Sequence, residues 1–355
     1  EVEKQEFVKR EIPADLVEST RKRVAEAGLH PTDDEYNGLL AYVWPAMVKM
    51  KKRDDKYRAV REKNFTTEEG REYLRELSID ELPGLTTPET TAVMLALSFE
   101  MGMPIHFVAP AFGFQKNIPY PDNEKLREMI TPIWNICEKF GVSIGFHSGS
   151  GKSAENYQVA GQVTGSNLEI KTSGRYTYEM GVALSNSSDP YDQELWKDWY
   201  NFTIDLASNG CFAEDETERK MAREFVSLTL DEESSKKAFS SIEDCRTILQ
   251  SLEPSPDHFF WFEYNFLYVL AAGGSAEKNS LGDHSSEGYK QRKRFYSISE
   301  QGKLLYSKRV SEYIIFLAHN TGLVSSGICV DALSELETFS EYSDFVGSIS
   351  NCHSD

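Results

Sequence analysis

The sequence predicts an α/β protein with a parallel sheet, because short apolar segments alternate with helical ones. Each apolar segment ends in polar or turn-forming residues, and these ends recur roughly every 30 residues, as in a strand–helix repeat. The full expectation is a (β/α) barrel-like parallel sheet, incomplete at the N-terminus, with added helices. The four predicted strands are Leu77–Asp80, Ile105–Ala109, Ser143–Phe146 and Leu168–Lys171.

Residues 1–70 are predicted to form an N-terminal helical arm. Thr32 is followed by three acidic residues, which favour a helix start because they face the positive end of the helix dipole. Apolar side chains between Leu39 and Met50 then recur at helical spacing.

Residues 71–185 are predicted to carry the strand–helix repeats and the functional site. Thr87 before Pro88 is typical of a helix start, and Gly102 of a helix end. Asp122 is predicted to cap a helix that ends near Phe140.

The remaining chain divides into three predicted segments. Residues 186–255 form an acidic helical insertion with Trp196 and Trp199 as core anchors. Residues 256–320 close the barrel, and the apolar stretch from Phe259 to Ala271 fits either a buried strand or a helix. Residues 321–355 are a serine-rich acidic tail for which no defined structure is predicted.

Composition excludes some partners. The formal net charge of −19 argues against a broad basic surface that binds nucleic acid or an anionic membrane. No apolar run approaches the roughly 20 residues of a membrane span. The five cysteines are scattered without a Cys-x-x-Cys pair, which indicates reduced thiols and a cytoplasmic protein.

The stretch S-I-G-F-H-S-G-S-G-K, residues 143–152, has the composition of a site at a sheet edge. In a site, His147 is a metal ligand or a proton carrier, and the glycines let a ligand approach the backbone. The alternative is a polar turn whose histidine only caps the strand. A phosphate-binding P-loop is excluded, because Phe146 stands where that motif needs its first glycine.

Four residues at strand ends are expected to meet at one rim, because parallel strands in a barrel carry the active site at their carboxyl ends. Asp80 and Glu81 are adjacent, so their side chains point to opposite sides, which allows one to be a general acid or base and the other structural. The alternative is that both cap the following turn. Lys171 binds a substrate carboxylate, polarises a carbonyl, or is a surface lysine. His147 is the fourth residue.

Four motifs in this order resemble the tagaturonate epimerase family of bacterial hexuronate catabolism. They are LSIDE, APAFGFQKNIPY, GFHSGSGK and LEIKTSG. The resemblance is clearest from Asp34 to Glu179 and thinner from there to His319.

The resemblance implies a metal-dependent α/β barrel enzyme that interconverts tagaturonate and fructuronate by inverting one hydroxyl carbon. His147 then matches a divalent-metal ligand (Zn, Mn or similar) and Glu81 a proton donor, with Asp80 as the second catalytic residue. The expected partner is a small sugar acid, and a homo-oligomer is expected. Substrate contacts are predicted for Lys171, Ser148, Ser150 and Thr172.

This sequence departs from the family pattern at several positions. The family's first acid/base aspartate and a neighbouring metal histidine would lie upstream of Glu1. Tyr268 stands where a further metal histidine is expected, Gly151 where aspartate is usual, and Ala111 where arginine is expected. We therefore expect this chain alone to bind divalent metal weakly, and Tyr268→His to strengthen binding.

Two other functions remain open. A catalytically silent family member would bind sugar acids without converting them. A metal-dependent aldolase of similar architecture would release a three-carbon product. His284 and His319 are minority candidates for the missing metal ligands.

Overall fold

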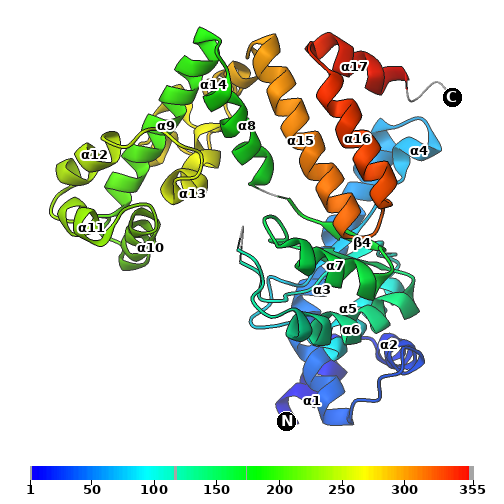
Figure 1. Ribbon diagram of the computed structural model, residues 1–355. Coiled ribbons are helices and arrows are strands. Elements are labelled where there is room, and N and C mark those ends of the chain that lie inside the picture. The colour runs from blue at the N-terminus through cyan, green and yellow to red at the C-terminus, as the bar shows by residue number, and fades with distance from the viewer. Residues whose placement is uncertain (1, 116–117, 173, 352–355) are drawn as a thin grey trace. The chain divides into compact units, whose positions relative to one another are not determined.

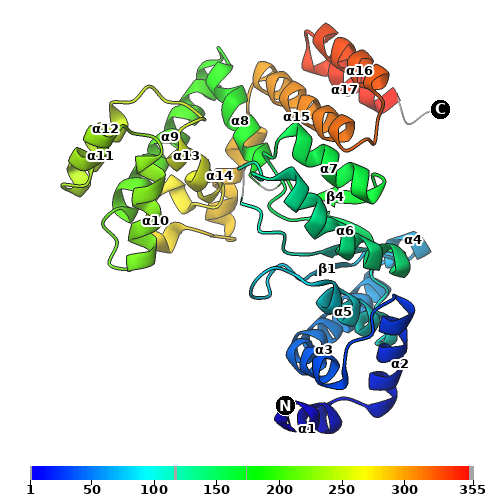
Figure 2. The same ribbon diagram turned by 60° about the horizontal axis from the view of Figure 1, so that its bottom comes forward.

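The computed structural model describes residues 2–115, 118–172 and 174–351 (Figures 1 and 2). The chain divides into two compact units. The first contains residues up to 172 together with 317–325, and the second contains 174–316 together with 326–351. Cys352, predicted as a reduced thiol, lies outside the described residues.

The first unit consists of helices and a small sheet. Its helices are α1 Val2–Glu11, α2 Ala14–Glu26, α3 Asp33–Asn64, α4 Glu68–Arg71, α5 Pro88–Glu100, α6 Asn123–Phe140 and α7 Ala154–Thr164. Its strands are β1 Glu76–Ser78, β2 Phe107–Ala109, β3 Ser143–Phe146 and β4 Leu168–Ile170.

The sheet is parallel and its strands lie in chain order, β1-β2-β3-β4. The α/β class and all four predicted strands are confirmed. A closed barrel stays a prediction, because the described residues contain these four strands in an open order.

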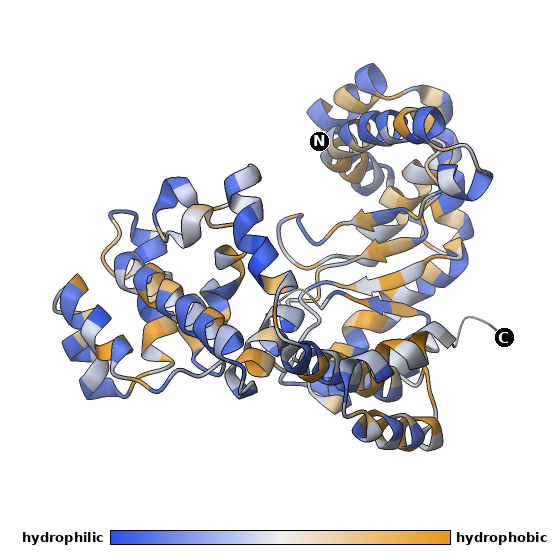
Figure 3. Ribbon diagram, turned by 90° about the horizontal axis from the view of Figure 1, so that it is seen from above, coloured by the Kyte–Doolittle hydropathy of each residue, from blue (hydrophilic) through white to orange (hydrophobic). Residues whose placement is uncertain are grey.

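One face of the sheet is apolar and buried. Leu77, Val108, Ile144 and Phe146 are each at most 3% exposed and belong to one core with residues of α5, α6 and α7. Figure 3 shows how hydrophobic residues recur along the strands. Because side chains alternate along a strand, the polar residues between them lie on the other face.

The predicted helix starts are confirmed. Thr32 makes a capping box with Glu35 at the start of α3, Thr87 caps α5, and Asp122 caps α6. Gly141 follows α6 with a φ of 66°, a left-handed conformation that glycine adopts without strain.

The second unit is helical throughout its described residues. It contains α8 Arg175–Asn186, α9 Pro190–Gly210, α10 Glu216–Ser227, α11 Glu232–Ala238, α12 Ile242–Gln250, α13 Phe259–Tyr268, short 3-10 turns at Ala272–Gly274 and Lys278–Ser280, α14 Ser286–Tyr296, α15 Glu300–Asn320, α16 Ser326–Thr338 and α17 Tyr342–Asn351. The last residues of α15 belong to the first unit.

The apolar stretch from Phe259 forms helix α13, so the strand interpretation is wrong. Trp261, Asn265 and Tyr268 recur at intervals of four and three residues and are buried on one face of the helix. Trp199 of α9 packs against this face, and its Nε1–H donates to the Asn265 carbonyl over 2.8 Å. Packing in an aromatic core therefore favours a helix, where the sequence alone was compatible with a strand or a helix.

The tail is helical between Ser326 and Asn351, where the sequence predicted no defined structure. Leu336 and Phe345 are 5% and 9% exposed, and Phe345 meets Phe339 edge to face. The five-segment division of the chain stays a prediction. Within the described residues, no helix is both long and apolar enough to cross a membrane.

Candidate active site

The polar face of the sheet has small residues at its centre. Ser78 pairs with Ala109, and Gly145 pairs with Glu169, so these residues form one row across the strands. A Cβ placed on Gly145 would lie 2.8 Å from Glu169 Oε1 and 3.4 Å from the Ala109 Cβ. The Glu169 side chain therefore occupies the space that the glycine leaves.

His147 follows β3 directly and lies between two carboxylates. Its Nδ1 is 2.9 Å from Asp80 Oδ2, and its Nε2 is 2.9 Å from Glu76 Oε1. The imidazole is only 10% exposed. Ser148, the next residue, has a φ of 53°, so the backbone turns sharply away from the strand here.

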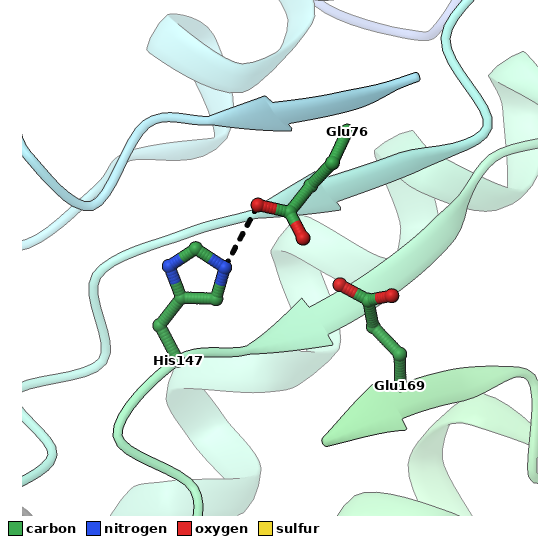
Figure 4. Close-up of side chains that lie close together, drawn as sticks. All are labelled: Glu76, His147 and Glu169. Atoms are coloured by element: carbon green, nitrogen blue, oxygen red, sulfur yellow. Dashed lines mark ion pairs between the residues drawn. The ribbon is translucent and has the colours of Figure 1, made fainter. Parts of the chain in front are cut away.

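Glu76 and Glu169 reach each other across the sheet. One ligand atom each from Glu76, His147 and Glu169 lie within 4.8 Å of one another (Figure 4). Their strands, β1 and β4, are the two edges, about 14 Å apart at three strand spacings on a flat sheet. The side chains must therefore extend over the intervening strands, where Ala109 and Gly145 leave room.

The two glutamates have opposite pKa shifts. Burial, the hydrogen bond with Glu76 and the charge of Glu76 raise the pKa of Glu169 to about 7. Burial also opposes ionisation of Glu76, but hydrogen bonds from Glu169 and Ser78 and the charges of His147 and Lys171 lower its pKa below the usual value. Near neutral pH the pair therefore shares a proton that resides mainly on Glu169.

Two buried atoms of the cluster have no hydrogen-bond partner among the described residues: His147 Nε2 and Asp80 Oδ1. Glu76 Oε1 is close to Nε2, but its direction is not that of a hydrogen bond. In the neutral imidazole that donates its Nδ1–H to Asp80, Nε2 has a lone pair that can bind a metal ion, whereas in the charged imidazole Nε2 carries a proton. An imidazole oriented by a carboxylate, beside two further carboxylates, fits the donor set of a Zn²⁺ or Mn²⁺ site.

The structure brings some of the predicted site residues together. Asp80 contacts His147 directly, and the charge of Lys171 acts on both glutamates. Glu81 is exposed, and its side chain has no hydrogen-bond or ion-pair partner in the described chain. The adjacent acids thus point to different surroundings, as predicted, and it is Asp80 that faces the cluster.

The four residues predicted to contact the substrate differ in their exposure to solvent. Ser148 and Thr172 are half-buried, whereas Ser150 is fully buried within the turn. Lys171 is exposed at the end of β4. The roles proposed for these four residues stay predictions.

Lys152 is buried next to the turn that follows His147 and binds backbone carbonyls there. It is 5% exposed, and its Nζ donates to the carbonyl oxygens of Gln115, Ile118 and Ser150 over 2.5, 2.8 and 3.3 Å. Burial lowers its pKa to about 8. The lysine of the rejected P-loop motif therefore joins the turn after His147 to the loop after β2.

Sequence reasoning missed Glu76 and Glu169. Glu76 directly precedes the predicted strand Leu77–Asp80, and Glu169 lies within the predicted strand Leu168–Lys171. Because side chains alternate along a strand, Glu76 lies on the same face as Asp80, and Glu169 on the same face as Lys171. A glutamate inside an apolar strand, level with a glycine of the next strand, was the signal that could have identified Glu169.

Tyr268 and Gly151 have local explanations. Tyr268 is 1% exposed in the aromatic core of the second unit, and its hydroxyl accepts a hydrogen bond from Arg294 over 2.8 Å. Gly151 has a φ of 65°, which an aspartate would adopt only with strain. Whether either change alters metal binding stays a prediction.

The fold and site define an α/β protein with carboxylates and an imidazole gathered on one face of a parallel sheet, where Asp80 and His147 follow the carboxyl ends of β1 and β3. Proteins of this class hold their active sites at the carboxyl ends of the strands. The cluster lies within residues 56–234, which match the family described as tagaturonate epimerase. The chain belongs to the tagaturonate epimerase family.

One solved structure supports this fold. The native crystal structure of the fructuronate-tagaturonate epimerase UxaE from Cohnella laeviribosi has a TM-score of 0.54 and 16% sequence identity, covering 90% of this chain and 60% of that one. Two glycerol complexes of that enzyme have TM-scores of 0.49 and 0.45 and identities of 17% and 15%, covering 94% and 91% of this chain and 60% and 62% of theirs. The chain thus spans about 60% of the native structure. No curated protein matches it.

Proposed function

We propose that this chain provides the acid–base part of an epimerase site that interconverts the keto-hexuronates tagaturonate and fructuronate. The observation that supports this most is the cluster of Asp80, His147, Glu76 and Glu169 at one face of the sheet. Family membership supports the substrate class.

The reaction needs groups that move protons at one hydroxyl carbon. That carbon is β to the ketone, so simple enolisation does not reach it. In a retro-aldol route, a base takes the hydroxyl proton, the neighbouring carbon–carbon bond breaks, the aldehyde rotates, and the bond re-forms on the other face. Removal and return of the carbon-bound proton is the second route.

The two glutamates supply a base and an acid for either route. Glu76 has a lowered pKa and is ionised at neutral pH, whereas Glu169 has a pKa of about 7 and retains a proton. Carboxyl groups whose surroundings separate their pKa values in this way divide acid and base roles between them. The family resemblance implies Glu81 as the proton donor, but Glu81 is exposed and Asp80 faces the cluster, so we assign the acid role to Glu169 and the orientation of His147 to Asp80.

A divalent cation fits the same cluster. His147 Nε2 and one oxygen each of Glu76 and Glu169 would hold it, and the cation would replace the proton that the glutamates share. The two glutamates would then be ligands, so their division into acid and base belongs to the site without the cation. When bound, Zn²⁺ or Mn²⁺ supplies Lewis-acid stabilisation of the enediolate. The sequence predicted weak metal binding because it supplied His147 as the one ligand. The two glutamates raise the proposed number of ligands to three.

Substrate recognition is assigned to the rim around this cluster. Lys171 is exposed beside the glutamates and would bind the substrate carboxylate, with the half-buried Ser148 and Thr172 as hydroxyl donors. Ser150 is fully buried and presents no surface to a substrate, so its predicted contact is not part of this proposal. A cytoplasmic location and a homo-oligomer belong to the same proposal.

The test is conversion of tagaturonate by the purified protein with Mn²⁺ or Zn²⁺, followed by chromatography for fructuronate. We expect Glu169→Gln and His147→Asn to abolish conversion. Glu138→Gln, which removes an exposed carboxylate from α6, should leave it unchanged. No fructuronate at any metal concentration would contradict the epimerase proposal.

The same experiment distinguishes the alternatives. A three-carbon product would indicate an aldolase. Binding of a sugar acid without conversion, measured by calorimetry, would indicate a catalytically silent member. Metal titration is read separately: His147→Asn should weaken Zn²⁺ binding, and unchanged binding would show that other residues hold the metal.

A further inference from the structure

The first unit has a pocket at the amino ends of β1 and β2. The pocket has a volume of about 520 Å³, within the range of small-molecule sites. Its wall is formed by Arg58 of α3, by the segment that leads into β1, and by residues that precede β2. Because β1 and β2 are parallel, the pocket lies at their amino ends, whereas His147 follows the carboxyl end of β3.

Arg75 is fixed at this pocket by a buried carboxylate. Its Nε lies 2.6 Å from Asp54 Oδ1, and its Nη2 donates to the Tyr73 hydroxyl over 3.0 Å. Asp54 is 6% exposed and also accepts from Tyr73 over 2.6 Å. The arginine is therefore held in place before any ligand arrives, which reduces the entropy lost on binding.

Two further arginines line the pocket and are more exposed. Arg58 donates through Nη2 to Asp54 and to the Gly102 carbonyl, each over 3.0 Å. Arg71 donates through Nε to the Phe65 carbonyl over 3.1 Å. Arg71 Nη1 also lies 3.5 Å from Glu62 Oε1, and Arg58 also has a hydrogen bond with Tyr73. A guanidinium carries five N–H donors, so both groups keep donors for a ligand.

His106 adds a neutral donor. Its Nδ1 accepts the backbone N–H of Arg75 over 3.0 Å, which leaves the ring proton on Nε2. The imidazole is half-buried in the pocket wall. The pocket is thus lined by three guanidinium groups and an imidazole N–H.

The nearby charges favour an anion. The pocket lining and the side chains that contact it contain four arginines and three acids, whereas the chain as a whole has a net charge of −19. The fourth arginine, Arg61, donates to the carbonyls of Gly70, Arg71 and Glu72. The acids are Asp54, which is saturated by its partners, Glu62, which lies 3.5 Å from Arg71, and Glu72, which is exposed at the pocket.

We propose that this pocket binds the phosphate group of a small metabolite, or free phosphate. Several guanidinium groups that line one pocket can donate hydrogen bonds to the four oxygens of a phosphate dianion. A carboxylate offers only two oxygens and one charge. The site is separate from the cluster at His147 and does not depend on the proposed epimerase activity.

The test is calorimetric titration of the whole chain with inorganic phosphate at low ionic strength, against acetate as the carboxylate probe. We expect saturable one-to-one binding of phosphate, and Arg58→Gln and Arg71→Gln each to weaken it about tenfold, equivalent to roughly 1.4 kcal/mol. Arg53→Gln is the matched control, because it removes the same charge from an exposed position of α3 outside the pocket.

Three outcomes would overturn the proposal. One is no saturable binding at about 10 mM phosphate, tenfold above a Kd of about 1 mM. Another is an equal loss of affinity in Arg53→Gln, which would indicate only the general charge of the helix. The third is tighter binding of acetate than of phosphate. Circular dichroism of both pocket variants shows whether they remain folded, and since both positions are largely exposed, either one decides the question.

Discussion

At the scale of single residues, the site depends on carboxylates that cannot all be ionised together. Glu76 and Glu169 approach each other in a partly buried place, so keeping one proton between them avoids two adjacent negative charges. His147 is oriented by Asp80 and faces Glu76. The proton on Glu169 and the orientation of the His147 ring are therefore the properties that variants should alter.

The raised pKa of Glu169 predicts a pH dependence of stability. Folding favours the protonated form, so this group stabilises the folded state fully below its usual value of 4.5, and the contribution is lost as pH rises to about 7. Urea unfolding between these values should show stability falling with pH from this group. Glu169→Gln should remove that component.

A carbon-13 NMR titration of the Glu169 carboxyl tests the same prediction directly. A midpoint near the usual glutamate value would contradict it. The lowered pKa of Glu76 acts in a different window: its contribution is present above the usual value and lost as pH falls below it.

Gly145→Ala tests the space beneath Glu169. The new Cβ would lie 2.8 Å from Glu169 Oε1, so the carboxyl must move, whereas the 3.4 Å contact with Ala109 is ordinary packing. We expect the pKa of Glu169 to fall toward its usual value and the free energy of unfolding to change by less than about 1 kcal/mol. Gly38→Ala, where no atom lies closer than 3.9 Å, is the control. An unchanged Glu169 titration would show that the glycine does not determine its position.

At the scale of elements, the turn after β3 and the loop after β2 form one assembly. Tyr157 of α7 donates through its hydroxyl to the Gly149 carbonyl over 2.7 Å, and the backbone N–H of Lys152 donates to the same hydroxyl over 3.2 Å. Asn156 accepts from the Tyr120 backbone N–H over 2.8 Å. Helix α7 therefore holds both the turn that carries His147 and the far end of the loop.

Lys152→Met should loosen this assembly. The substitution removes the donor to three carbonyls in a buried place, and we expect a loss of about 1–3 kcal/mol in the free energy of unfolding. Limited proteolysis should then cut between Ala111 and Tyr120 faster than in the unmodified chain. Lys139→Met, in the last turn of α6 and exposed, is the control. Equal cleavage in both variants would show that Lys152 does not hold the loop.

At the scale of the whole molecule, charge is the dominant property. At a formal net charge of −19, the excess negative charges repel one another in the folded state and destabilise it. Raising salt from about 10 mM to 150 mM shortens the Debye length from roughly 30 Å to 8 Å and should raise the thermal midpoint. Differential scanning calorimetry in sodium chloride measures this, and a midpoint that falls with salt would show that local ion pairs outweigh the net repulsion.

The sequence by itself determined the α/β class, the four strands and the caps of α3, α5 and α6, because periodicity and capping act over a few residues. It also predicted that Asp80 and His147 meet, since residues at the ends of parallel strands lie at one edge, and their side chains are 2.9 Å apart. Their roles in a site stay predictions.

Only the tertiary structure decided that Glu76 and Glu169 complete the cluster, because their meeting depends on register and on the small side chains of Ala109 and Gly145 between them. It likewise decided that the stretch from Phe259 is a helix, since burial against Trp199, and not local pattern, selects the helical face.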